Sequence, residues 1–498
     1  MLDLLGYNLQ KNIHVFRQGD EFIAYDVNSG SLHVVDETAY RVLKALLKIE
    51  EHGLEFKREV VDQILNLTSA TASTPRLPPS EVEDILSELG SLQQEGILFS
   101  PEAEPRGPVY PSKPLVKAIC LHVAHDCNLR CEYCFAGTGA FGGNRKLMDF
   151  ETGKRGIDFV LEASGHRSHC EVDFFGGEPL LNFGVVKELV RYGKEAAANK
   201  GKSIKFTLTT NAVLLGDEVQ SFLEEEDISV VLSLDGRSEV HDRMRPYANG
   251  RGSYDKVVPS IQKFVQKRPD SSPYAIGTYY YVRGTYTHFN LDFDQDVRHM
   301  LDLGMQRISL EPVVASPGEP YAFQPEDVEV IKETYDRLGE EIARRRTEGE
   351  EFSFFHFNTA FERGPCLPKR LSGCGAGHEY VAISPEGDLY PCHQFVGQEK
   401  YKLGSLYAAD PLALEPRLVE AFRSAHVYAK PACRECWARF SCSGGCHAAN
   451  SAATGTLTDV YQLGCEFQKK RLEVAFYLKI KEIEPGKVTT EGEFLTNC

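Results

Sequence analysis

The chain of 498 residues carries a formal net charge of −17, with 42% hydrophobic and 26% charged residues. This composition is that of a soluble globular protein, and the length predicts two or three domains, because one hydrophobic core seldom extends over so long a chain. The acidic balance argues against a nucleic-acid backbone or an anionic membrane as the main partner, since both bind basic surfaces.

The N-terminal segment lacks a charged region followed by an unbroken apolar run. No other stretch approaches the roughly 20 apolar residues of a membrane-spanning helix. We therefore expect a cytoplasmic protein. In that reducing compartment the fourteen cysteines are expected to serve a metal or catalysis rather than disulfides.

Residues 1–100 predict a small domain of three antiparallel strands followed by helices. Three segments alternate apolar and polar residues and are joined by the turn sequences QGD and NSG: NIHVFRQ, EFIAYDV and SLHVVD. Two later segments have apolar residues at helical spacing, ETAYRVLKALL and SEVEDILSELGSLQQEGIL. The Pro-rich segment 101–115 then predicts a linker.

Residues 116–350 predict an α/β fold in the form of a partial (β/α)6 barrel. Six strand candidates are separated by amphipathic segments: AICLHVAH, EVDFFGG, IKFTLTTN, ISVVLSLDG, YYYVRGTY and RISLEPV. This alternation is typical of parallel βα units, whose chemistry gathers at the carboxyl ends of the strands. Polar motifs follow five of these strands, HDCNLRC, GGEP, TTN, SLDG and RGT. We expect them to lie on one face.

The first of these motifs places Cys127, Cys131 and Cys134 at a C-x3-C-x2-C spacing. Three thiolates can hold three irons of a cubane cluster and leave the fourth iron open for a small molecule. The alternative is a zinc site, for which His122 or His125 would supply the fourth ligand. A loop at the end of a barrel strand is a poor place for such a closed structural site.

The cysteine spacing, together with Tyr133 before the third cysteine and the six βα units, resembles the CxxxCxΦC loop of the radical S-adenosylmethionine (SAM) enzymes. In that family, SAM binds the open iron of a [4Fe–4S] cluster. One electron then cleaves SAM to methionine and a 5′-deoxyadenosyl radical. The resemblance implies that Cys127, Cys131 and Cys134 are the cluster ligands and form the catalytic centre.

The same resemblance implies that other strand ends contact SAM. Gly176, Gly177, Glu178 and Pro179 match the GGEP motif, in which bare backbone and a carboxylate receive the amino group of SAM. Further polar contacts are implied at Thr209, Thr210, Asn211, Ser233 and Asp235, and a contact to the SAM carboxylate at Arg283. Alternatives stay open, because Thr and Asn at a strand end also cap helices and an arginine also forms surface ion pairs.

Beyond residue 365 the sequence becomes rich in Cys and Gly, with the pattern C-x2-C-x5-C-x3-C. It resembles the SPASM domain of radical SAM peptide-modifying enzymes, which carries two auxiliary [4Fe–4S] clusters. The implied ligands are Cys374, Cys392 and Cys446 for the first and Cys433, Cys436, Cys442 and Cys465 for the second. Cys366 either completes the first cluster or leaves its iron open for a substrate thiolate. Zinc ribbons are the alternative for paired cysteines.

This Cys-rich domain is expected to extend over residues 351–484, with a last helix CEFQKKRLEVAFYLKIKEIE and a polar tail at 485–498. Cys120, Cys170 and Cys498 fit no spacing and are expected to be ordinary thiols. His356 and His393 are expected to be locally satisfied histidines, although His393 adjoins Cys392 and is able to donate a hydrogen bond to cluster sulfur.

The strand and helix order of residues 1–100 resembles the PqqD-like winged-helix domains that recognise the leader segments of ribosomally made peptides. An exposed edge strand can accept such a leader by β-augmentation. The alternative is a DNA-reading winged helix, which is disfavoured because residues 1–100 are not rich in Lys or Arg.

With these three parts in order, the whole chain resembles the maturases of SCIFF peptides, which form thioether links between a cysteine sulfur and a carbon of another residue, often threonine. The implied partners are a Cys-rich precursor peptide bound through its leader and an electron donor such as flavodoxin or ferredoxin. In the implied mechanism the radical abstracts a hydrogen from the acceptor carbon, the carbon–sulfur bond forms, and an auxiliary cluster takes up the remaining electron.

Three other functions compete with this interpretation. A formylglycine-forming sulfatase maturase and a carbon–carbon crosslinking enzyme would have the same fold and clusters. An iron–sulfur redox sensor that binds DNA would not cleave SAM, so the formation of 5′-deoxyadenosine distinguishes it from the enzymes.

Overall fold

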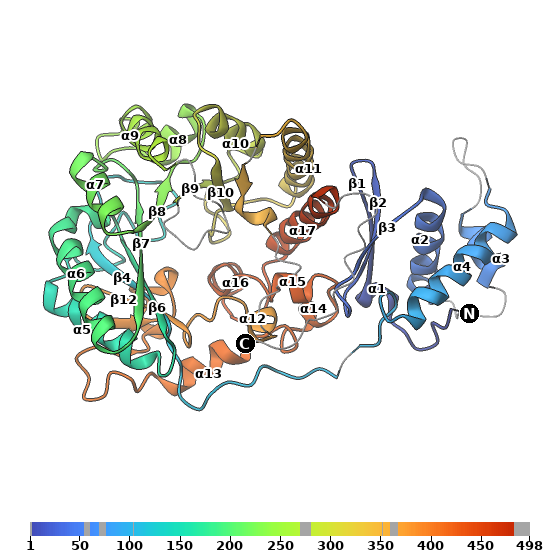
Figure 1. The fold of residues 1–498 in the computed structure, drawn as a ribbon, viewed down its shortest axis with the longest axis horizontal. Coiled ribbons are helices and arrows are strands. Elements are labelled where there is room, and N and C mark those ends of the chain that lie inside the picture. Colours follow the sequence, from blue (N-terminus) through green and yellow to red (C-terminus); the bar gives the residue numbers. More distant parts are fainter. Residues whose placement is uncertain are drawn as a thin grey trace.

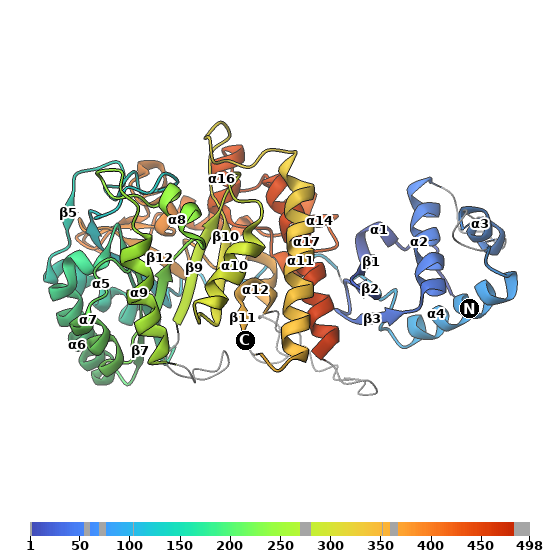
Figure 2. The ribbon, with the colours of Figure 1, turned by 90° about the horizontal axis from the view of Figure 1, so that it is seen from above.

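The computed structural model describes residues 2–53, 60–68, 76–102, 104–268, 280–350, 352–358 and 367–482. In this part of the chain, no helix is long and apolar enough to cross a membrane. The N-terminal part lies at one end of the molecule and approaches the rest beside a long C-terminal helix (Figures 1 and 2).

The N-terminal part contains the three predicted antiparallel strands, in the sheet order β1, β2, β3. They are β1 (Ile13–Gln18), β2 (Glu21–Asp26) and β3 (Leu32–Val35), with helices α1 (Leu9–Asn12), α2 (Glu37–Glu51), α3 (Val60–Leu67) and α4 (Pro79–Gln94). The sequence predicted α2 and α4 but not α1 and α3. Helix α2 begins at Asp36, whose carboxylate accepts a hydrogen bond from the backbone N–H of Ala39 at 2.7 Å.

The six predicted barrel strands form one parallel sheet. They are β4 (Ala118–His125), β6 (His169–Gly176), β7 (Ser203–Thr210), β8 (Ser229–Ser233), β9 (Tyr280–Tyr286) and β10 (Arg307–Pro312), each parallel to the next. Helices lie on the outer side of this curved sheet (Figure 1). These are α5 (Phe150–Ala163), α6 (Phe183–Asn199), α7 (Asp217–Glu225), α8 (Ser238–Met244), α9 (Tyr254–Gln266), α10 (Phe293–Asp302) and α11 (Asp327–Thr347).

The alternation within β6 explains how the sheet obtains two faces. Val172 and Phe174 are fully buried in the large core, and the Phe174 ring stacks on Phe206 of β7 at 5.5 Å. Asp173 and Phe175 point to the opposite face because successive side chains of a strand alternate. The concave face of the sheet is therefore lined by residues that the outer helices do not cover.

The sheet extends beyond the six predicted strands. Strand β11 (Ser353–Phe354) pairs in parallel with β10, and β12 (Tyr380–Ile383) pairs in parallel with β4. Strands β13 (Asp388–Tyr390) and β14 (Gly404–Ser405) continue it antiparallel, and β5 (Lys146–Leu147) pairs antiparallel with β4. The Cys-rich region, predicted as a loop-rich domain, thus shares a sheet with the barrel.

Short helices carry most of the Cys-rich region. They are α12 (Leu367–Ser372), α13 (Pro416–Ser424), α14 (Pro431–Arg434), α15 (Arg439–Cys442) and α16 (His447–Thr454), with the 3-10 turns η2 (Phe355–Phe357), η3 (His393–Phe395) and η4 (Glu399–Tyr401). A further 3-10 turn, η1 (Pro179–Asn182), lies in the barrel between β6 and α6. The predicted last helix is α17 (Gln462–Glu482), which packs along α11 and against β1. The predicted tail at 485–498 lies outside the described residues.

Candidate iron–sulfur and SAM site

The first cysteine group, Cys127, Cys131 and Cys134, lies in the loop that follows β4. Each pair of these thiols interacts electrostatically, so the three side chains gather in one place. The backbone N–H of Leu129 donates a hydrogen bond to the Cys127 sulfur at 3.4 Å. Burial raises the pKa of the Cys127 and Cys131 thiols to about 12. A cationic group is needed to hold them as thiolates.

A buried network around Asp235 holds this loop against the sheet. The hydroxyl of Tyr133 donates to one carboxylate oxygen of Asp235 at 2.6 Å. The other oxygen accepts the backbone N–H of Thr285 at 2.9 Å and lies 3.0 Å from Nε of Arg245. Both carboxylate oxygens of Asp235 therefore have protein partners. The sequence analysis missed Arg245, because no spacing links it to the cysteine motif.

The GGEP segment ends β6 directly beside the cysteine loop. A Cβ atom on Gly176 would lie 2.2 Å from the carbonyl oxygen of Ala124, and one on Gly177 would lie 2.1 Å from that of Asp126. Only glycine permits so close an approach, and Gly176 also has φ +139°. The 3-10 turn η1 follows at Pro179. The end of β6 and the cysteine loop are thus in direct backbone contact.

The Glu178 carboxylate, predicted to receive the amino group of SAM, is held by groups of the protein. The side chain is fully buried, and its oxygens accept hydrogen bonds from the Leu180 N–H at 3.0 Å, the Thr210 hydroxyl at 2.8 Å and the Asn211 N–H at 2.8 Å. Burial raises the pKa of Glu178 to about 7. Glu178 and Thr210 therefore tie the ends of β6 and β7 together.

The remaining predicted contacts lie on, or directly after, the neighbouring strands β7, β8 and β9. The Asn211 side-chain amide donates to Oδ1 of Asn128 at 2.7 Å and lies 3.6 Å from the Cys127 sulfur. Thr209 and Ser233 are half-buried on β7 and β8. Arg283 pairs with Ser233 in the register of β8 and β9, and its guanidinium lies 3.6 Å from Glu311 with 47% of the side chain exposed. These residues thus come from three neighbouring strands, and Arg283 lies within β9 rather than after it as predicted.

An aromatic layer connects the cysteine loop with the Cys-rich region, and the sequence analysis missed most of it. Phe135, which follows Cys134, lies 5.5 Å from the His393 ring, and His393 follows Cys392. The Phe175 ring lies 5.0 Å from the same histidine. His122, His125 and Phe141 complete the layer. Nε2 of His122 is buried without a hydrogen-bond partner in the described part of the chain.

Seven of the other cysteines lie in two groups. Electrostatic interactions link Cys392 to Cys374 and Cys446, and link Cys465 to Cys433, Cys436 and Cys442. Backbone N–H groups donate to two of the sulfurs, from Gln394 and Phe395 to Cys392 and from Gly444 and Gly445 to Cys442. Such hydrogen bonds stabilise anionic sulfur. Cys366 lies outside the described residues.

Other predicted details of this region can be checked directly. Cys120 and Cys170 are buried, whereas Cys498 lies outside the described residues. Nε2 of His356 lies 3.1 Å from Glu311. Within the described ranges, no three His, Cys, Asp or Glu side chains converge where a single metal ion could bind.

The chain matches two family models. Residues 117–259 match a model described as a 4Fe-4S single cluster domain. Residues 374–437 match the SPASM model, described as an iron-sulfur cluster-binding domain. The two matches cover the loop of the first cysteine group and much of the Cys-rich region, so both parts bind iron–sulfur clusters.

The chain is 30% identical over 225 residues to uncharacterized protein MJ0907 of Methanocaldococcus jannaschii, covering 45% of this chain and 72% of that protein. It is 26% identical over 381 residues to the cysteine-type anaerobic sulfatase-maturating enzyme of Clostridium perfringens, covering 73% of this chain and 97% of the enzyme. The solved structure of native anSMEcpe with bound AdoMet and Cp18Cys peptide matches with a TM-score of 0.59 at 20% identity, over 74% of this chain and 99% of that chain. The chain thus belongs to the radical SAM family, carries a SPASM domain and is related to the anaerobic sulfatase-maturating enzymes.

Proposed function

We propose that the chain is a radical SAM maturase that forms intramolecular thioether links in a ribosomally made Cys-rich peptide. Each link would join a cysteine sulfur to a carbon of threonine or another residue. The observation that carries this proposal is the gathering of three thiols at the carboxyl ends of parallel strands, with two further cysteine groups in the region that continues the same sheet.

The residues fit three [4Fe–4S] clusters. Cys127, Cys131 and Cys134 supply three thiolates and leave one iron for SAM. The donor set is soft, and a backbone N–H already faces the Cys127 sulfur. When bound, the first cluster and SAM would supply a 5′-deoxyadenosyl radical, and the auxiliary clusters would accept the second electron of the oxidation.

The chain's own groups would orient SAM and keep the loop in place. We assign the backbone of Gly176 and Gly177 to binding the amino group of SAM, because no side chain lies between this backbone and the cysteine loop. Asn211, beside Cys127, and the half-exposed Arg283 would face the methionyl end. Thr209 and Ser233 remain candidates for the ribose. Glu178 and Asp235 would position these groups from the buried side.

For the auxiliary clusters we assign seven described cysteines. Cys374, Cys392 and Cys446 would hold the first, and Cys433, Cys436, Cys442 and Cys465 would hold the second. The role of Cys366 determines where the substrate sulfur binds, because Cys366 would be the fourth protein ligand of the first auxiliary cluster. With three protein ligands, that cluster would present an open iron to a substrate thiolate.

A peptide substrate is supported by a relative that is named a sulfatase-maturating enzyme and by a similar solved structure that contains a bound peptide. The N-terminal part offers a place for the leader. Strand β3 is an edge of its described sheet, and Val34 on it is 53% exposed. An extended leader could add to this edge through main-chain hydrogen bonds.

The acidic net charge of the chain disfavours a nucleic-acid partner. As the electron donor we propose flavodoxin or ferredoxin.

The link would replace one C–H and one S–H bond by one C–S bond, so two hydrogens leave the peptide. One leaves as the hydrogen atom that completes 5′-deoxyadenosine, and the thiol gives up its proton. A second candidate, favoured by the named relative, is oxidation of a cysteine to formylglycine. That reaction removes sulfur from the peptide, so the mass of the product distinguishes formylglycine formation from thioether formation.

The test is an anaerobic assay of the reconstituted chain with SAM, a reductant and a short Cys-rich peptide encoded beside its gene. We expect two-hydrogen losses that protect cysteine from alkylation. The Cys436→Ala variant should still form some 5′-deoxyadenosine but no link, whereas Cys170→Ala, at a buried cysteine outside the groups, should behave as wild type. Loss of sulfur would favour the formylglycine reaction, and an unchanged peptide would reject both.

A further inference from the structure

Lys430 is a fully buried cation in the Cys-rich region. It precedes α14, has 0% relative exposure and is among the largest fully buried side chains. Its Nζ donates a hydrogen bond to the carbonyl oxygen of Gly444 at 2.8 Å. In the described part of the chain, no carboxylate lies within ion-pairing distance of it. A buried ammonium without a counter-charge costs several kcal/mol.

The groups that surround this ammonium are thiols from both auxiliary cysteine groups. Cys433, Cys442 and Cys465 of the four-cysteine group interact with it electrostatically, and so does Cys446 of the other group. Burial lowers the pKa of Lys430, and each of these thiols acts in the opposite direction and favours the charged lysine. If these sulfurs are thiolates of iron–sulfur clusters, Lys430 has anionic neighbours from both cysteine groups.

The backbone between Cys442 and Cys446 is shaped for this arrangement. Ser443, Gly444 and Gly445 all have positive φ, at 61°, 85° and 74°. This conformation turns the Gly444 carbonyl toward Lys430 while the N–H groups of Gly444 and Gly445 donate to the Cys442 sulfur. A Cβ atom on Gly444 would lie 3.3 Å from Nζ of Lys430. One short turn therefore serves the ammonium and the thiol.

We propose that Lys430 is the shared buried counter-cation of the two auxiliary clusters and that it raises the reduction potentials of both. The inference rests on the ligand assignment of the proposed function. A cluster gains negative charge on reduction, so a nearby positive charge in a low-dielectric site favours the reduced form. Lys430 is a positioning and tuning residue, since it would act through the clusters and not on the substrate.

The test compares Lys430→Gln with wild type in a full-length background that lacks Cys127, Cys131 and Cys134, so that only the auxiliary clusters give signals. Redox titration followed by electron paramagnetic resonance measures their midpoint potentials. We expect the Lys430→Gln variant to lower at least one potential by an amount equal to about a tenfold change in equilibrium constant, about 59 mV for one electron. The Lys430→Arg variant should recover most of the lost midpoint potential.

A matched control is Lys402→Gln, because Lys402 is a partly exposed lysine that pairs with Asp388 at 2.9 Å on β13. The midpoint potentials of the Lys402→Gln variant should equal those of the background chain that has no substitution at Lys402. Unchanged potentials in Lys430→Gln at full iron content would overturn the proposal, as would equal iron loss in Lys430→Gln and Lys430→Arg, because charge would then not matter. A background chain that retains none of the expected eight or so irons would instead refute the ligand assignment itself.

Discussion

At the scale of single residues, the hydroxyl of Tyr133 attaches the loop of the first cysteine group to the sheet. Tyr133 lies between Cys131 and Cys134 and donates to the fully buried Asp235 at 2.6 Å. We predict that Tyr133→Phe weakens the attachment of the loop by about 1.5–3 kcal/mol, the range for a hydrogen bond to a charged group. The variant should lose iron from the first cluster faster than wild type, as measured by iron content during incubation with a chelator.

The control is Tyr192→Phe, which removes a similar hydrogen bond from Tyr192 to Asp158 at 2.5 Å between α6 and α5, away from the cysteines. Its iron retention should equal that of wild type. If the two variants lose iron at the same rate, Tyr133 has no special part in holding the loop.

A second residue-scale prediction concerns Asp173 on the concave face of β6. Burial raises the pKa of this carboxyl from 3.8 to about 7. The folded chain thus keeps its proton where the unfolded chain has lost it, and stability falls as pH rises from about 4 to about 7. Asp173→Asn should remove this loss, worth up to about 4 kcal/mol for three pH units. Thermal unfolding at pH 5 and pH 8 measures it.

In that experiment the midpoint of Asp173→Asn should exceed that of wild type by more at pH 8 than at pH 5. An equal difference at both values would mean that Asp173 ionises normally in the folded chain. A lower midpoint at pH 8 would mean that the charged carboxylate is stabilising.

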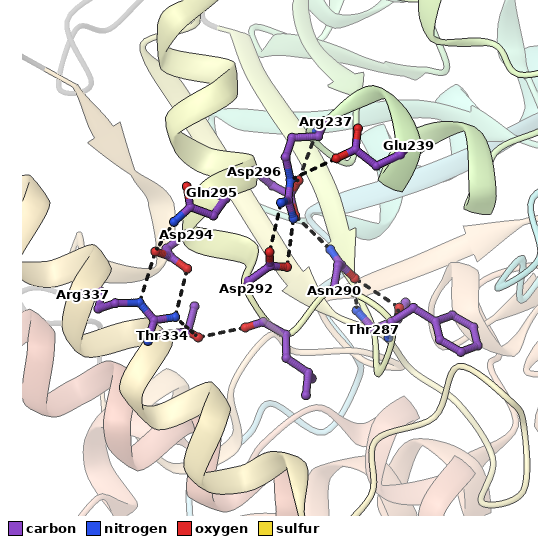
Figure 3. Close-up of polar contacts among 12 residues, drawn as sticks. Arg237, Glu239, Thr287, Asn290, Asp292, Asp294, Gln295, Asp296, Thr334 and Arg337 are labelled. Atoms are coloured by element: carbon purple, nitrogen blue, oxygen red, sulfur yellow. Dashed lines mark hydrogen bonds and ion pairs between the residues drawn. The ribbon is translucent and has the colours of Figure 1, made fainter.

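At the scale of elements, the loop after β8 is fixed to α10 by Arg237 (Figure 3). Its guanidinium binds Asp292 with two bonds of 2.9 Å and Asp296 with bonds of 2.8 and 3.5 Å. The Asp296 side chain is fully buried. Arg237→Met should therefore cost about 3 kcal/mol of stability, because it leaves a buried carboxylate without its cation. Chemical denaturation measures the change.

Lys187→Met is a suitable comparison, since the Lys187–Glu218 pair at 2.9 Å is largely exposed. It should change stability little, because exposed ion pairs contribute little. Equal losses in the two variants would show that the pairing of Arg237 with Asp296 adds nothing beyond a surface ion pair.

The elements themselves were largely predictable. The six parallel strands follow from local apolar segments and α17 from a long run of helix-forming residues, both of which are visible in short stretches of sequence. The pairing of β12 with β4 was not, because Tyr380 and Ala118 are adjacent only in space. The C-x3-C-x2-C spacing of the first cysteine group is likewise local. The assignment of the other cysteines to two clusters came from the resemblance to SPASM domains and stays a prediction. Arg245, Phe141 and Lys430 escaped because their partners lie elsewhere in the chain.

At the scale of the whole molecule, Arg439 joins the N-terminal part to the Cys-rich region. Its guanidinium donates to the carbonyl of Lys11 at 2.8 Å and to the side chains of Asn12 at 2.7 Å and Asn28 at 3.1 Å. It also donates to the Cys436 carbonyl at 3.1 Å. Arg439→Met should leave these acceptors unpaired and loosen β1 and β2, at about 1–3 kcal/mol for each buried group.

Hydrogen exchange of β1 and β2, followed by mass spectrometry, tests this junction. Lys481→Met is the control, because Lys481 forms partly exposed ion pairs with Asp20 at 2.9 Å and Glu21 at 2.6 Å. We expect faster exchange in Arg439→Met only. Unchanged exchange would mean that other contacts, such as the His14 ring stacked on Trp437 at 3.7 Å, are sufficient.

The central claim is that the loop of Cys127, Cys131 and Cys134 cleaves SAM. The most direct measurement is the amount of 5′-deoxyadenosine formed by the reduced, reconstituted chain and by its Cys127→Ala variant under anaerobic conditions. The account predicts its formation by wild type and none by the variant. Equal amounts from both, or none from a wild-type chain with full iron content, would contradict it.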